Sequence, residues 1–313
     1  LMMYPLVFKH FHDAEEPKCV NVPGSVTSED LEELILAIGC DNILDPLEYI
    51  QRRNDGTLQP HHTCFTIDAG LQCQYQIALP VLERHNLRAL WHVYVSTDKI
   101  NTPELLDIFT YSHAQNYRSN GEFCEAFFAA ATRLNGSRIH EALLTAEAAV
   151  FHSYIPFETV SERKLRFLRD VTLSRQQFYD VIADMANRDS FASISPVDID
   201  ESIWLSDEQI HELALMGHSV GFLDQNALLC DEANVITTRK VELNRDYTKL
   251  RDIIHADSGL NTNFPVSLVH SGNIGQFTGS CDLKEQQMKC GFLRSGIIRE
   301  ELDESPFALL RID

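Results

Sequence analysis

A run of β-forming residues that ends in a carboxylate and a glycine limits the folds open to this chain. Residues Thr63 to Gly70 have the sequence TCFTIDAG, in which Asp68 stands near the end of the run. Apolar residues at helical spacing follow over 75–85, and a second β-rich run covers 87–97. This order predicts a β-α-β unit with a right-handed crossover. Because α/β folds place their chemistry at C-terminal strand ends, Asp68 is a candidate functional residue.

The patterns on either side of this unit predict more strands and helices. A cap-like Ser206 with Gln209 three positions later predicts a capping box at a helix start, and Gly217 predicts the end of that helix. Immediately after it, His218 is expected to interact with the last carbonyls of the helix. Strands are expected over 4–8, from 219 and over 264–269, a final strand or tail over 308–313, and helices over 28–39, 46–53, 247–255, 281–290 and at several places in 104–190.

Charge and cysteine content exclude several classes of function. The chain has 26 Lys and Arg against 46 Asp and Glu, a net charge of −20, so it is a poor ligand for nucleic acid or anionic membrane. No stretch reaches the roughly 20 apolar residues of a membrane helix. Eight dispersed cysteines without a CxxC pair favour free thiols in a reducing compartment. The sequence therefore predicts a cytoplasmic protein without a membrane span.

Several motifs together resemble the polysaccharide deacetylase family of carbohydrate esterases. Residues 66–70, TIDAG, are similar to its T-F-D-D-G motif, and residues 78–89 resemble the helix that leads to the second strand. Residues 205–221 look like its second anchor, a helix followed by a G-H-x-I-G strand. Residues 269–272 sit where many members have a Y-P-x-G turn, and residues 305–313 resemble the ending of members acting in surface-polysaccharide synthesis.

The resemblance implies an α/β fold, a distorted (β/α) barrel with a helical insertion over about 101–190, forming a single domain over 1–313. The family removes acetyl groups from N-acetylated sugars with a divalent metal, usually zinc, held by one Asp and two His. A neighbouring Asp acts as base, and Asp68 matches that position. The three ligand positions fall on Ala69, Leu223 and Ala227, which cannot coordinate a metal. We therefore predict that the metal cofactor is absent.

Other residues near these positions are candidates for a rebuilt site. Asp224 and Asn226 stand where the family has its histidine motif, and His270 follows a predicted strand, so we predict all three to bind substrate. A relocated metal set that joins them to Asp68 is an open alternative. His61 and His62 precede the strand of Asp68 and are too far along it to share a metal.

Three functions remain open. The first is hydrolysis of a C–N (N-acyl) bond on a sugar in surface-glycan biosynthesis, with Asp68 as base. The alternative is a catalytically inactive, metal-free relative that binds a glycan or nucleotide sugar, or scaffolds a biosynthetic protein partner through its insertion. The third is metal-independent sugar chemistry in which Asp68 and His270 form an acid/base pair.

Overall fold

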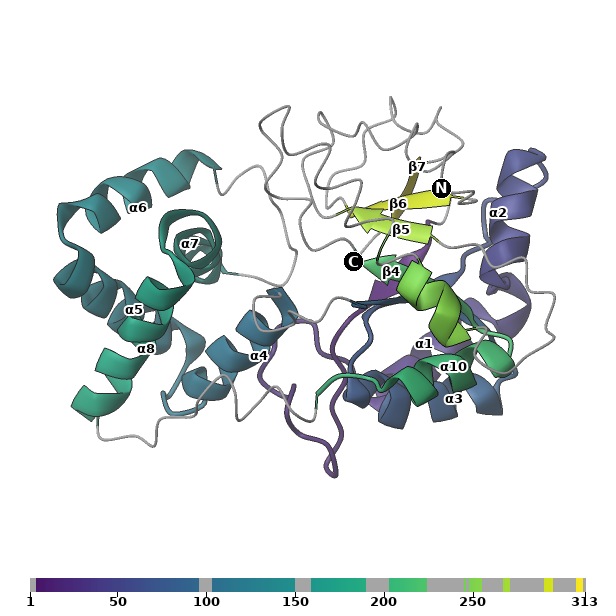
Figure 1. Cartoon of the computed structure of the whole chain (residues 1–313), viewed down its shortest axis with the longest axis horizontal. Helices are drawn as coiled ribbons and strands as arrows, with labels where there is room; N and C mark the ends of the chain where they lie inside the picture. The colour runs from purple at the N-terminus through teal and green to yellow at the C-terminus, as the bar shows by residue number, and fades with distance from the viewer. Residues whose placement is uncertain are drawn as a thin grey trace. The chain divides into compact units, whose positions relative to one another are not determined.

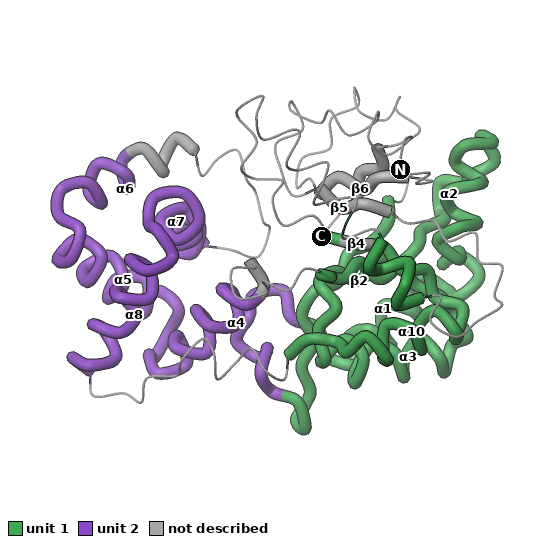
Figure 2. The backbone as a smooth tube through the Cα atoms, viewed as in Figure 1, with its two compact units in different colours: residues 1–16, 26–99, 202–313 green, residues 17–25, 100–201 purple. Residues whose placement is uncertain are grey.

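The computed structural model of this 313-residue chain describes residues 4–95, 103–149, 159–189, 203–223, 245, 248–254, 267–270, 290–294 and 308–311. Two compact units make up the chain (Figure 2). Unit 1 contains residues 1–16, 26–99 and 202–313, and unit 2 contains residues 17–25 and 100–201. The prediction that 1–313 forms a single domain stays a prediction.

Unit 1 is built on a seven-stranded parallel sheet whose strand order is the order of the chain. The strands are β1 Leu6–Phe8, β2 Phe65–Ala69, β3 Ala89–Val93, β4 Ser219–Leu223, β5 Ser267–His270, β6 Cys290–Arg294 and β7 Ala308–Arg311 (Figure 1). Parallel neighbours in sequence order are the strand succession of a (β/α) barrel. The predicted α/β fold is therefore confirmed.

Helices connect the strands of unit 1 where the sequence predicts them. These elements are α1 Ser28–Ile38, the 3₁₀ turn η1 Cys40–Asn42, α2 Pro46–Asn54, the π-helical η2 Gln74–Ala78, α3 Leu79–Arg84 and α10 Asp207–Leu215. The start of α10 is the predicted capping box, with the Ser206 side chain accepting from the Gln209 N–H. Gly217, with φ of +86°, follows the C-terminal end of the helix. Local capping chemistry thus sets these helix boundaries.

The neighbouring strands β2 and β3 are buried along their whole length. Such continuous burial is typical of parallel strands that are covered on both faces. The register places Asp68 opposite His92 and Ala69 opposite Val93. Because directly opposite residues of a parallel pair share one face of the sheet, the side chains of Asp68 and His92 point the same way.

Unit 2 is helical, as predicted for residues 104–190. Its elements are α4 Pro103–Ala114, α5 Asn120–Asn135, α6 Ser137–Ala149, α7 Val160–Phe167, the π-helical η4 Leu168–Thr172 and α8 Arg175–Asp189. Its core contains Phe123, Phe127 and Phe178, each at most 1% exposed. The buried Arg169 bonds the carboxylates of Asp107 and Asp170. Apolar packing and the paired charge of Arg169 therefore both contribute to holding this unit together.

The C-terminal predictions have mixed outcomes. Residues 248–254 are helical, within the helix expected over 247–255, and strands occur at 267–270 and 308–311. The helix expected over 281–290 is wrong at its last residue, since Cys290 begins β6, and its other residues lie outside the described ones. In the described part of the chain, no helix has both the length and the apolar character required to cross a bilayer.

Candidate functional site

The turn after β2 brings the chain out of the sheet through two residues with left-handed backbone. Ala69 has φ of +92° and Gly70 has φ of +71°. A Cβ atom on Gly70 would lie 2.9 Å from Val93 Cγ1, so only glycine fits between the turn and β3. Conformations of this kind cost free energy in an alanine and cluster at functional sites. The surrounding structure therefore holds Ala69, at the end of β2, in an unfavourable backbone conformation.

One buried amide holds this turn. The Gln74 side chain is fully buried, and its Oε1 accepts from the Leu71 N–H at 2.9 Å. Its Nε2 donates to the Lys9 carbonyl at 2.6 Å and also to the Asp68 carbonyl. Gln74 thus uses both donors and its acceptor on backbone groups at the ends of β1 and β2. Buried backbone groups need such partners, so Gln74 keeps the segment that carries Asp68 in register.

Asp68 and His92 form a buried pair at this end of the sheet. His92 Nδ1 lies 3.0 Å from Asp68 Oδ1, and the residues are 0% and 3% exposed. Sequence reasoning identified Asp68 but missed His92. The available signal was a histidine within the apolar run Leu90–Val93 of the strand after Asp68. An imidazole bound to a carboxylate can hold or pass a proton, so the pair has the elements of acid/base chemistry.

The residues at the resembled family's metal positions do not fit a metal ion. Ala69 and Leu223 end β2 and β4, and both carry hydrocarbon side chains. The third position, Ala227, lies outside the described residues, but its methyl group is equally unable to coordinate. Within the described ranges, no three His, Cys, Asp or Glu side chains come together in a way that could hold a metal. A hydrolytic zinc normally has three protein ligands, so the donor set is unsuitable.

The predicted substrate-binding residues are only partly described. His270 is the last residue of β5, and its backbone pairs with Leu293 of β6. Its place at a C-terminal strand end agrees with the sequence pattern. Asp224 and Asn226 lie outside the described residues. The roles of all three in binding stay predictions.

The prediction for His218 is wrong. Its ring Nδ1 accepts the Ala89 N–H, at 3.1 Å, at the start of β3, and its Nε2 is buried without a hydrogen-bond partner among the described residues, so the ring bonds none of the last carbonyls of α10. The backbone N–H of His218 bonds the Leu213 carbonyl instead. The ring is 2% exposed, and burial together with the nearby Arg88 lowers its pKa to about 4. His218 is therefore a neutral hydrogen-bond acceptor that joins the starts of two strands.

Comparisons with known proteins agree with this architecture at the level of fold. No protein-family model matches the chain, and curated protein sequences yield no significant match. Among solved structures, the Streptococcus pyogenes deacetylase PplD, in complex with acetate, superposes with a TM-score of 0.51 at 13% identity, covering 100% of this chain and 92% of that one. IcaB from Ammonifex degensii has a TM-score of 0.50 at 11% identity, covering 99% and 91%.

PplD is a deacetylase, and its structural likeness to this protein extends over the whole chain. The predicted deacetylase-type fold is therefore confirmed. At sequence identities this low, the structural likeness shows a common fold only, and a fold alone does not determine activity.

Proposed function

We propose that this chain is a divergent polysaccharide-deacetylase-like protein that binds a glycan or nucleotide sugar of surface-glycan biosynthesis and lacks the family's metal-dependent hydrolysis. The observation that carries the proposal is a deacetylase-type fold whose metal positions hold Ala69 and Leu223. Amide hydrolysis at neutral pH needs a strongly activated nucleophile, which a metal supplies by lowering the pKa of bound water. Without these ligands the chain lacks that source of hydroxide, which supports a binding role without metal-dependent hydrolysis.

A second candidate function is favoured by the contact between Asp68 and His92. In this alternative the chain hydrolyses an N-acyl bond on a sugar without a metal, and Asp68 is the base. The hydrogen bond to His92 Nδ1 would fix the orientation of the carboxylate and share its proton. Water activated by a carboxylate base alone is a weaker nucleophile than a metal-bound hydroxide, so this candidate ranks second.

Measurements of metal content, binding and turnover separate the two functions. Purified full-length chain is analysed for metal content, titrated calorimetrically with N-acetylated oligosaccharides and with a UDP-linked N-acetyl sugar, and assayed for acetate release with and without added Zn²⁺. The expected result is sugar binding with neither stoichiometric metal nor acetate release. Stoichiometric zinc, or acetate release that needs zinc, would overturn the first proposal.

Two variants test the second candidate with a matched pair of changes. Metal-free acetate release that is lost in both Asp68→Asn and His92→Phe would establish the hydrolase in place of the binding protein. Metal-free acetate release that persists in both variants would show that Asp68 is not the base and that His92 does not assist it. The cytoplasmic location and a biosynthetic protein partner for the helical unit remain proposals beside this one.

A further inference from the structure

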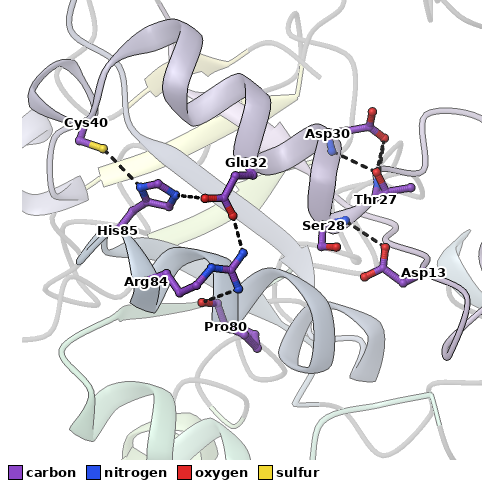
Figure 3. A network of polar contacts seen from close by, with 9 residues as sticks. All are labelled: Asp13, Thr27, Ser28, Asp30, Glu32, Cys40, Pro80, Arg84 and His85. Atoms are coloured by element: carbon purple, nitrogen blue, oxygen red, sulfur yellow. Dashed lines mark hydrogen bonds and ion pairs between the residues drawn. The ribbon is translucent and has the colours of Figure 1, made fainter.

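A cysteine, a histidine and a glutamate form a connected cluster on unit 1, apart from the residues used above (Figure 3). The Cys40 thiol lies 3.7 Å from His85 Nδ1, and His85 Nε2 lies 2.6 Å from Glu32 Oε1. The second carboxylate oxygen of Glu32 bonds the Arg84 guanidinium. Cys40, His85 and Glu32 therefore supply in succession a nucleophile, a base and a group that orients the base. This is the arrangement that activates catalytic thiols.

Local backbone structure fixes the members of this cluster. Glu32 lies within α1, and Cys40 follows its C-terminal end, where Gly39 takes φ of +85° and its N–H bonds the Ile35 carbonyl. His85 is the C-cap residue that follows α3, and its N–H bonds the Val81 carbonyl. Both reacting side chains thus stand on capped helix ends, and their separation does not depend on a long loop.

The hydrogen-bond geometry favours one tautomer of the neutral His85 ring. Glu32 can only accept when ionised, so the Nε2 atom of His85 carries the proton that faces it. Hydrogen bonds from Arg84 and His85 lower the pKa of Glu32, which keeps this carboxyl ionised. Nδ1 of the neutral ring then presents its lone pair to Cys40 Sγ. The geometry is ready for transfer of the thiol proton to His85.

Exposure distinguishes Cys40 from the four other cysteines whose side-chain burial the structure describes. Cys19, Cys64, Cys73 and Cys124 are buried, whereas Cys40 is exposed. The side chain of His85 is 16% exposed and that of Glu32 is 32% exposed, so the base is shielded while the sulfur meets solvent. Reactive thiols in proteins combine these two conditions, an accessible sulfur and an adjacent base.

We propose that Cys40 is a nucleophilic modification site that exchanges with disulfides of low-molecular-mass thiols, with His85 as its base and Glu32 as a positioning residue. The Sγ proton passes to His85 Nδ1, and the thiolate attacks one sulfur of the disulfide. A new bond joins Sγ to that sulfur, the original disulfide bond breaks, and the released thiolate takes up the proton. Cys40 is thereby oxidised to a mixed disulfide, and half of the incoming disulfide is reduced to a thiol.

Residue-resolved labelling tests this proposal despite the eight cysteines of the chain. The full chain is treated with iodoacetamide, and separately with glutathione disulfide, at neutral pH, and modification of the Cys40 peptide is followed by mass spectrometry. We expect His85→Gln to slow both reactions at Cys40 about tenfold. Glu32→Gln should slow them about threefold, and the double variant should match His85→Gln because the two residues act through one proton transfer.

Controls separate chemistry from folding. His140→Gln changes an exposed histidine of unit 2 and should leave the Cys40 rate unchanged. In the wild-type chain, Cys40 should react faster when folded than in urea, a comparison that holds even where a variant fails to fold. Equal rates in wild type and folded His85→Gln, or independent effects of Glu32→Gln and His85→Gln, would overturn the proposal. None of these results depends on sugar binding, so failure here leaves the proposed function untouched.

Discussion

Replacing Gln74 by methionine should destabilise unit 1 while leaving the shape of its core nearly unchanged. Methionine has a similar length but cannot replace the three hydrogen bonds that the amide makes to Leu71, Lys9 and Asp68. Each buried backbone group left without a partner costs about 1–3 kcal/mol, and the carbonyls fall at the low end because each has a second lone pair. The expected loss is therefore about 3–5 kcal/mol in the free energy of unfolding.

The positions of the two tryptophans make the assay specific for unit 1. Both Trp91 and Trp204 belong to this unit, so tryptophan fluorescence during urea titration reports its unfolding and not that of unit 2. Gln51→Met, on the exposed side of α2, is the matched control and should change the free energy by less than about 0.5 kcal/mol. If Gln74→Met came within about 1 kcal/mol of this control, the role assigned to the buried amide would be refuted.

Two further predictions use the same fluorescence assay. Gly70→Ala should lower the free energy of unfolding by about 2–4 kcal/mol, because φ of Gly70 is +71° and the new methyl group would meet Val93. The control Gly56→Ala, with φ of +66° and nothing within 4 Å, should cost only about 1–2 kcal/mol. Equal losses in the two variants would contradict the close approach of Gly70 to Val93. Burial lowers the pKa of His218 from 6.5 to about 4, so as the pH falls the unfolded chain takes up the proton before the folded chain does. The free energy of unfolding should therefore decrease by about 3 kcal/mol in all as the pH is lowered from 6.5 to about 4. His218→Asn, which keeps an acceptor for the Ala89 N–H, should remove this share of the pH dependence, and an unchanged slope would show that His218 is not its source.

Sequence patterns predicted those parts of the fold that depend on neighbours along the chain. The helix over Ser28–Ile38 and the capping box at Ser206 follow from local spacing, and the β-forming runs over 63–70 and 87–97 predict the strands β2 and β3. These features need only short-range hydrogen bonds and periodic apolar residues, which a single sequence displays directly. The order of the strands followed from the family resemblance and agrees with the sheet.

The candidate site was harder to predict because its contacts cross between strands. His92 joins Asp68 only through the register of β2 with β3, and the sequence does not display that register. The same limit explains His218, whose ring bonds Ala89 from a position 129 residues later in the chain. The local sequence favoured the last carbonyls of the preceding helix as partners of the His218 ring. In the folded sheet, the buried Ala89 N–H needs an acceptor, and the ring supplies it.

The strand order described above also has a consequence for how unit 1 folds. Val93 pairs with Phe222 across 129 residues of chain, because unit 2 is inserted between β3 and β4, whereas Ala69 pairs with Val93 across only 24. Loop closure makes the first pairing about 1.5 kcal/mol more costly in chain entropy, since this cost grows with the logarithm of loop length. We therefore expect β2 and β3 to dock before β4. The bond from His218 to Ala89 then joins β4 to the sheet at the point where this long loop closes.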